Sequence, residues 1–151
     1  MNNSLQPILL AILDETFEHN HDFYLDEGTS LFETLAAISA AQASLAPSQG
    51  CASIAAQADH IRYFLDVLEQ ELLGHSIEAD WMNIWQNQRQ VTQQEWQTIK
   101  YNLQRSYERV VKIIQRPDTL QNEKGIGGAL AILAHTAYHL GEIRQCLCRF
   151  K

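Results

Sequence analysis

Apolar residues recur every three or four positions over long stretches of this chain, and this helical period limits its fold more than any other feature. The clearest stretch follows Thr92 and Glu95, whose spacing is that of a capping box at the start of a helix. Its apolar stripe consists of Trp96, Ile99, Leu103, Tyr107, Val110, Val111 and Ile114. Such a stripe predicts an amphipathic α-helix with one buried face, and Pro117 predicts that the helix ends before it.

Three further long stretches are expected to be helical. Ser4 can cap the first, while Ser53 can cap the second and Gly74 can end it. The third occupies the last part of the chain. The inward-facing positions are expected to be Leu5, Ile8, Leu9, Ile12, Leu13 and Phe17 in the first stretch and Ile54, Ala58, Ile61, Leu65, Leu68 and Leu72 in the second.

A shorter helix is predicted from the capping box of Ser30 and Glu33, and Pro47 and Gly50 are expected to end it. No stretch alternates apolar and polar residues between hairpin turns, as antiparallel strands would. The sequence also contains no repeat and no domain linker. We therefore expect an all-α fold, a four-helix bundle with one additional short helix, in a single domain over residues 1–151.

The overall composition excludes several classes of function. A formal net charge of −7 with scattered basic residues argues against nucleic acid as a partner, because phosphate binding needs a basic surface. No apolar run approaches the length of a membrane span, and the N-terminus lacks the basic region of a signal peptide. Three cysteines without a CxxC pair fit free thiols in a reducing compartment. We expect a soluble, cytoplasmic protein.

Two histidines in the last helical stretch are the first candidates for chemistry. His135 and His139 are four residues apart, so a helix places both imidazoles on one face, one turn apart. Their neighbours are almost all apolar, which predicts burial, and buried imidazoles need partners. A metal ion and a hydrogen-bonded network in the core are both consistent with this pattern.

A third histidine can complete a site. His60 is the only histidine within the body of the second long stretch, on the line of Ala56, Phe64 and Val67. If that line faces the last helix, His60 joins His135 and His139. Three imidazoles leave one position open for water or substrate, as in catalytic zinc sites. Nickel, iron or manganese also accept such ligands.

Other signatures of helical metal sites fit less well. A di-iron carboxylate site needs two E-x-x-H pairs, and this chain has one, Glu18 and His21, at a predicted helix end. The metalloprotease signature needs Glu directly after the first histidine, but Thr136 stands there.

Several neighbours could assist the histidines. Glu142 lies one turn beyond His139 and could hold its ring, and Asp59 is adjacent to His60; ordinary surface or helix-pairing roles are the alternative for both carboxylates. The tryptophans at positions 81, 85 and 96 could line a substrate entrance or simply pack the core and a lid.

Four stretches together resemble the DinB/YfiT-like metalloenzyme superfamily. They are residues 53–63, residues 80–85 with their two tryptophans, Glu95-Trp96, and residues 134–145 with the H-x-x-x-H pair, and they occur in the order of that family. The resemblance implies a four-helix bundle of up-down-down-up type, often dimeric. It also implies that His60, His135 and His139 are the metal ligands.

The function implied by the resemblance is a metal-dependent enzyme with an unidentified small-molecule substrate. Some members of the superfamily are transferases or isomerases that use a low-molecular-weight thiol at the metal. We therefore expect a divalent ion, zinc or nickel first and iron or manganese as alternatives, in an enzyme of thiol-transferase or hydrolase type. A non-enzymatic, stress-related bundle with a structural metal is the alternative, and a homodimer is expected for either.

Overall fold

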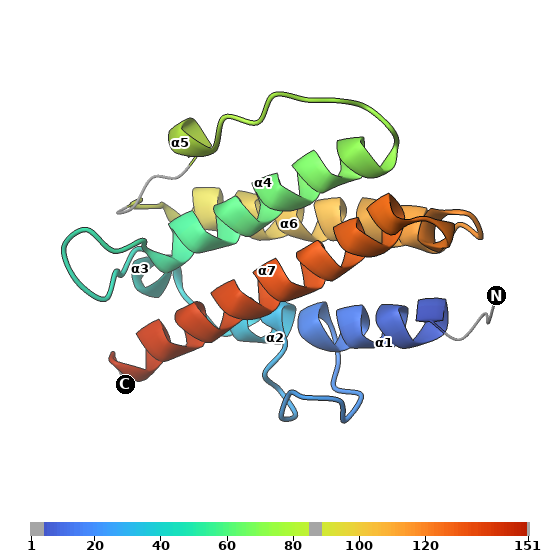
Figure 1. The fold of residues 1–151 in the computed structure, drawn as a ribbon. Helices are drawn as coiled ribbons and strands as arrows, with labels where there is room; N and C mark the ends of the chain where they lie inside the picture. Colours follow the sequence, from blue (N-terminus) through green and yellow to red (C-terminus); the bar gives the residue numbers. More distant parts are fainter. Residues whose placement is uncertain (1–4, 85–88, 151) are drawn as a thin grey trace.

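Helices make up all the regular secondary structure in the residues that the structure describes, 5–84 and 89–150. The structure is a computed structural model (Figure 1). The elements are α1 (Leu5–Phe17), α2 (Leu31–Ala36), α3 (Ala40–Ala43), α4 (Ile54–Leu72), α5 (Trp81–Ile84), α6 (Gln93–Ile114), η1 (Thr119–Gln121) and α7 (Glu123–Cys148). Four of these, α1, α4, α6 and α7, are long, so the prediction of an all-α fold is confirmed.

The predicted helix starts are determined by side-chain caps. The Ser30–Glu33 and Thr92–Glu95 pairs form complete capping boxes, and the Ser53 hydroxyl accepts a hydrogen bond from the backbone N–H of Ala56. Each cap satisfies N–H groups that have no partner inside the helix. The predicted cap Ser4 lies outside the described residues.

The single short helix predicted after Ser30 is in fact two. Ser39 adopts an extended backbone and forms a second capping box with Gln42, which starts α3 separately from α2. The segment predicted as a connection after Gly74 also contains the short helix α5. In both places the apolar run was too short to show a helical period.

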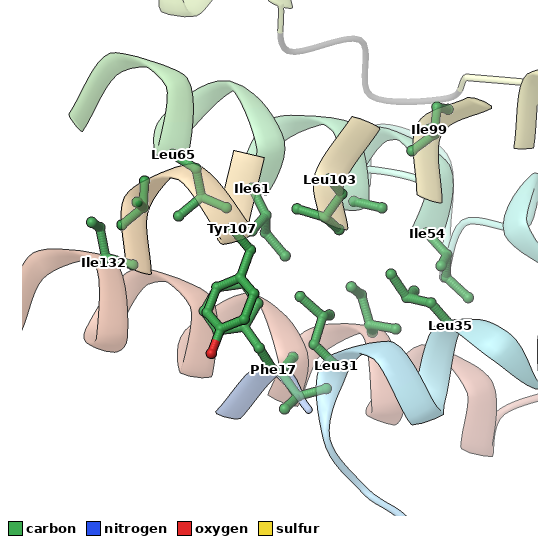
Figure 2. Packing of buried hydrophobic residues seen from close by; sticks show 14 of the residues in the cluster. Phe17, Leu31, Leu35, Ile54, Ile61, Leu65, Ile99, Leu103, Tyr107 and Ile132 are labelled. Atoms are coloured by element: carbon green, nitrogen blue, oxygen red, sulfur yellow. The ribbon is translucent and has the colours of Figure 1, made fainter. Parts of the chain in front are cut away.

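The core lies between the four long helices. α4 packs on both α6 and α7, and α1 packs on α7 and α6. Figure 2 shows side chains of these four helices and of α2 in one buried cluster. Within it, Phe17 of α1 is stacked on Tyr107 of α6 at a ring distance of 4.1 Å. Burying each large apolar side chain contributes about 1.5–3 kcal/mol, so this cluster is the main source of stability.

The long helices form two pairs that run in opposite directions. In Figure 1, α1 and α7 run one way, while α4 and α6 run the other way. Because α4 and α6 share a direction, the connection between them must return along the length of α4, and it carries α5 past that helix. Ring contacts of Trp81 with Tyr63 and Phe64 fix α5 beside α4.

A buried carboxylate orders the connection between α1 and α2. Glu15 is completely buried, and its oxygens accept hydrogen bonds from the backbone N–H groups of four residues in that connection, His21, Phe23, Tyr24 and Leu25. Burial by itself raises the pKa of Glu15, but the four donors outweigh it and lower the pKa to about 2. Glu15 is therefore ionised at neutral pH and holds the connection in place.

Among the described helices, none combines the length and the apolar character that crossing a membrane would require.

Candidate metal centre

Three histidines from two helices converge at the middle of the α4–α7 contact. His60 comes from α4, and His135 and His139 come from successive turns of α7. One ring nitrogen of each lies within 4.8 Å of the others, and the ring centroids are 4.6–5.0 Å apart. The structure thus brings together all three residues that the sequence nominated, close enough to hold a metal ion.

The distances between the nitrogens can be compared with those around a tetrahedral ion. An ion with Zn–N bonds of 2.0–2.1 Å holds its ligand nitrogens about 3.3 Å apart. The Nε2 atoms of His60 and His135 are 3.1 Å apart, and no pair exceeds 4.8 Å. One pair is therefore near the spacing found around zinc, and the group as a whole is close enough to hold an ion.

The protonation state of the histidines also suits a metal. Burial, together with the neighbouring imidazoles, lowers the pKa of His135 to about 3. Burial and the neighbouring His139 lower the pKa of His60 to about 4, against the opposing effect of the Asp59 and Glu142 carboxylates. Burial lowers the pKa of His139 as well, against the opposing effect of Glu142. All three rings are therefore neutral near pH 7, which is the form that donates a lone pair to a metal.

Glu142 sets the orientation of His139. One carboxylate oxygen of Glu142 lies 2.9 Å from Nδ1 of His139, so Nδ1–H donates to it and the lone pair remains on Nε2. A hydrogen bond between the Tyr138 hydroxyl and Glu142 raises the pKa of that tyrosine. Carboxylates that hold the second nitrogen of a histidine are a regular feature of metal sites.

Aromatic rings cover the histidines. Phe64, one turn after His60, stacks on His135 with a ring distance of 3.8 Å and an angle of 9°. The ring of Trp81 lies 6.1 Å from that of His60. Trp81 therefore borders the site, whereas Trp96 is fully buried and donates its indole N–H to the carbonyl of Ile38, as a core residue does. Trp85 lies outside the described residues.

Asp59 is engaged elsewhere. Its carboxylate pairs with Arg62 at 2.6 Å and with Arg89 of the connection before α6. Arg62 in turn pairs with Asp66, which accepts a hydrogen bond from Ser106 of α6. Asp59 thus belongs to an ion network that joins α4 to its neighbours, in agreement with the helix-pairing alternative.

The remaining candidates lie apart from the three histidines. His21 and His19 face Asp14 at 2.6 and 3.8 Å at the exposed end of α1, and Nδ1 of His75 contacts Gln70. The three cysteines, all of them described, carry free thiols.

Comparison with known proteins found no matching family model, no matching curated protein and no matching solved structure. The resemblance to the DinB/YfiT-like superfamily therefore stays a prediction that depends on the motifs of this chain.

Proposed function

We propose that His60, His135 and His139 bind one divalent metal ion and that the protein is a metal-dependent enzyme of thiol-transferase or hydrolase type. The observation that carries this proposal is the convergence of three neutral imidazoles within 4.8 Å. Three protein nitrogens leave a fourth position for water or a low-molecular-weight thiol. A bound ion would lower the pKa of such a ligand toward neutrality and create a nucleophile.

The residues around the histidines would each contribute to this chemistry. Glu142 keeps the lone pair of His139 on Nε2, and the stacked ring of Phe64 restricts the rotation of His135. Trp81 covers His60 from the side of α5 and would limit the access of water there. Zinc and nickel are the first candidates for the ion, with iron and manganese as alternatives, because all of them accept imidazole ligands.

The same proposal extends to fold, location and assembly. We propose a single-domain, up-down-down-up bundle of the DinB/YfiT-like type, supported by the opposite directions of the α1/α7 and α4/α6 pairs in Figure 1. Exposed apolar side chains on α1 and α7, Ile8 and Leu130, support a homodimer. The free thiols support a cytoplasmic location.

A second candidate is a non-enzymatic bundle in which the metal is structural. The specific observation in its favour is that the three ligands link α4 to α7, so that an ion would crosslink two core helices. A third alternative needs no ion, since the 3.1 Å contact between His60 and His135 is also a hydrogen-bond distance.

The primary experiment measures the metal content of untagged protein. We expect about one ion per chain in the wild type and in the control His75→Ala, which changes an exposed histidine away from the site. His135→Ala is expected to retain almost none. Equal, negligible metal in all three proteins would exclude both metal-dependent candidates and favour the hydrogen-bonded core.

Turnover then separates the enzyme from the structural bundle. Wild-type and metal-stripped protein are tested with a thiol and a panel of electrophiles, and with a panel of hydrolysable esters and amides. Metal-dependent turnover supports the enzyme. A large fall in melting temperature on chelation, with no turnover in either panel, supports the structural metal.

A further inference from the structure

Tyr138 packs on a histidine of the candidate metal centre although the tyrosine itself is exposed. Its ring centroid lies 5.1 Å from that of His139, and the two rings meet edge to face at an angle of 79°. This is a preferred arrangement of two aromatic rings. Phe64 stacks on His135 in a comparable way, so each of the two histidines of α7 has an aromatic ring packed against it.

The carboxylate that holds His139 is itself only loosely confined by packing. The side chain of Glu142 is 40% exposed, and holding a long exposed side chain in one position costs conformational entropy. A second contact on this carboxylate would offset the cost. Tyr138 is in the right place to supply it, because residues four apart on a helix are neighbours on its surface. The Tyr138 hydroxyl donates a hydrogen bond to Glu142.

We propose that Tyr138 is a positioning residue of the metal centre, which holds Glu142 in the rotamer that binds Nδ1 of His139. The hydroxyl acts on His139 through the carboxylate, and the ring acts on it directly by packing. Together the two contacts keep the lone pair of His139 on Nε2. The binding of an ion rests on the proposed function, but the orientation of His139 is a property of the metal-free protein as well.

The first experiment determines the tautomer of His139 in metal-free protein, from the ¹⁵N shifts of its ring in a long-range ¹H–¹⁵N spectrum near pH 7. We expect a single form protonated on Nδ1 in the wild type, because an ionised carboxylate can only accept a hydrogen bond. Tyr138→Phe keeps the ring but removes the hydroxyl, and we expect a measurable share of the Nε2–H form.

The matched control is Tyr101→Phe. Tyr101 lies on α6 and is 64% exposed, against 65% for Tyr138, but it is not among the residues around the histidines. We expect its tautomer spectrum to match that of the wild type. Most surface substitutions change stability little, so both variants should melt at nearly the wild-type temperature. A change of tautomer without a change in melting temperature would then report positioning and not a general loss of structure.

Zinc affinity measures the consequence for the metal centre. Since replacing a directly supporting residue costs 10–100-fold, we expect Tyr138→Phe to lose about three- to tenfold. Tyr138→Leu, which also removes the ring, should lose more. In protein that already carries Glu142→Ala, Tyr138→Phe should cause little further loss, because its hydroxyl acts through that carboxylate. Two independent effects would multiply instead.

The outcomes separate this inference from the metal proposal. An unchanged tautomer in Tyr138→Phe would overturn the inference, and so would an equal loss of zinc affinity with and without the Glu142 carboxylate. If the wild type binds no zinc, the proposed function fails. The tautomer of His139 in the metal-free protein then still decides whether Tyr138 positions the ring.

Discussion

The carboxylate of Glu142 lies 2.9 Å from Nδ1 of His139 and thereby fixes which nitrogen of that histidine faces the other two. Replacing Glu142 with Gln removes the charge but keeps the size of the side chain. Substitutions of such supporting residues usually cost 10–100-fold in metal affinity, and we expect a loss of this order for zinc in a competition with a chromophoric chelator. Glu123→Gln, at an exposed position in the first turn of α7, is the control and should retain wild-type affinity. Unchanged affinity in Glu142→Gln would contradict a supporting role for this carboxylate.

Trp81 provides an optical signal for the same site. Its ring lies 6.1 Å from that of His60, so a paramagnetic Ni²⁺ ion at the three histidines should quench its fluorescence. We expect saturable quenching in the wild type, and much less in Trp81→Phe and in His135→Ala. Quenching of equal size in His135→Ala would mean that nickel binds elsewhere.

The stability of the protein should depend on pH through Glu15. Its pKa in the folded chain is lowered to about 2 from an ordinary value of 4.5, so its contribution is complete above pH 4.5 and is lost as the pH falls toward 2. Glu15→Gln should lower the free energy of unfolding by about 1–3 kcal/mol at pH 7, because the hydrogen bonds to a charged acceptor become weaker. Denaturant titrations should show the difference from wild type shrinking between pH 4.5 and 2. In Glu27→Gln, an exposed residue of the same connection, we expect no difference at any pH.

Two neighbouring glycines of α7 should respond in opposite ways to alanine. A Cβ on Gly125 would lie 1.7 Å from the backbone carbonyl oxygen of Thr119, so Gly125→Ala must displace η1 or α7 and should cost about 1–3 kcal/mol or more. A Cβ on Gly127 meets no atom within 4 Å, and Gly127→Ala should gain about 0.5–1 kcal/mol through helix propensity. Thermal unfolding of the two variants measures the difference, and a stabilised Gly125→Ala would contradict the close contact.

The sequence predicted those parts of the fold that depend on local chemistry. The capping pairs Ser30–Glu33 and Thr92–Glu95 act within four residues, so they could be recognised without tertiary structure. The H-x-x-x-H spacing likewise placed His135 and His139 on one face. His60 meets these two histidines only because of the way α4 packs against α7. The apolar pattern around His60 allowed this packing but did not require it.

Other parts of the site could not be predicted because their partners are distant or have no periodic signal. The four donors of Glu15 come from an irregular connection six to ten residues away, and a single Glu in an apolar helix gives no sign of them. Gln57 is one turn from His60, but the burial of its unpartnered oxygen depends on how α4 packs against its neighbours. The i+4 spacing placed Phe64 on the same face as His60, but its stacking on His135 depends on how α4 meets α7.

The separation of His60 and His135 along the chain has a consequence for the order of events during synthesis. They are 75 positions apart, so the two imidazoles meet only after α4 and α7 have packed together. An ion held by all three histidines is therefore bound only once these helices have met, and the surface that leaves His60 and His135 partly exposed offers it a way in. Once bound, it would close a large loop of the chain and remove conformational freedom from the unfolded protein, which favours the folded one.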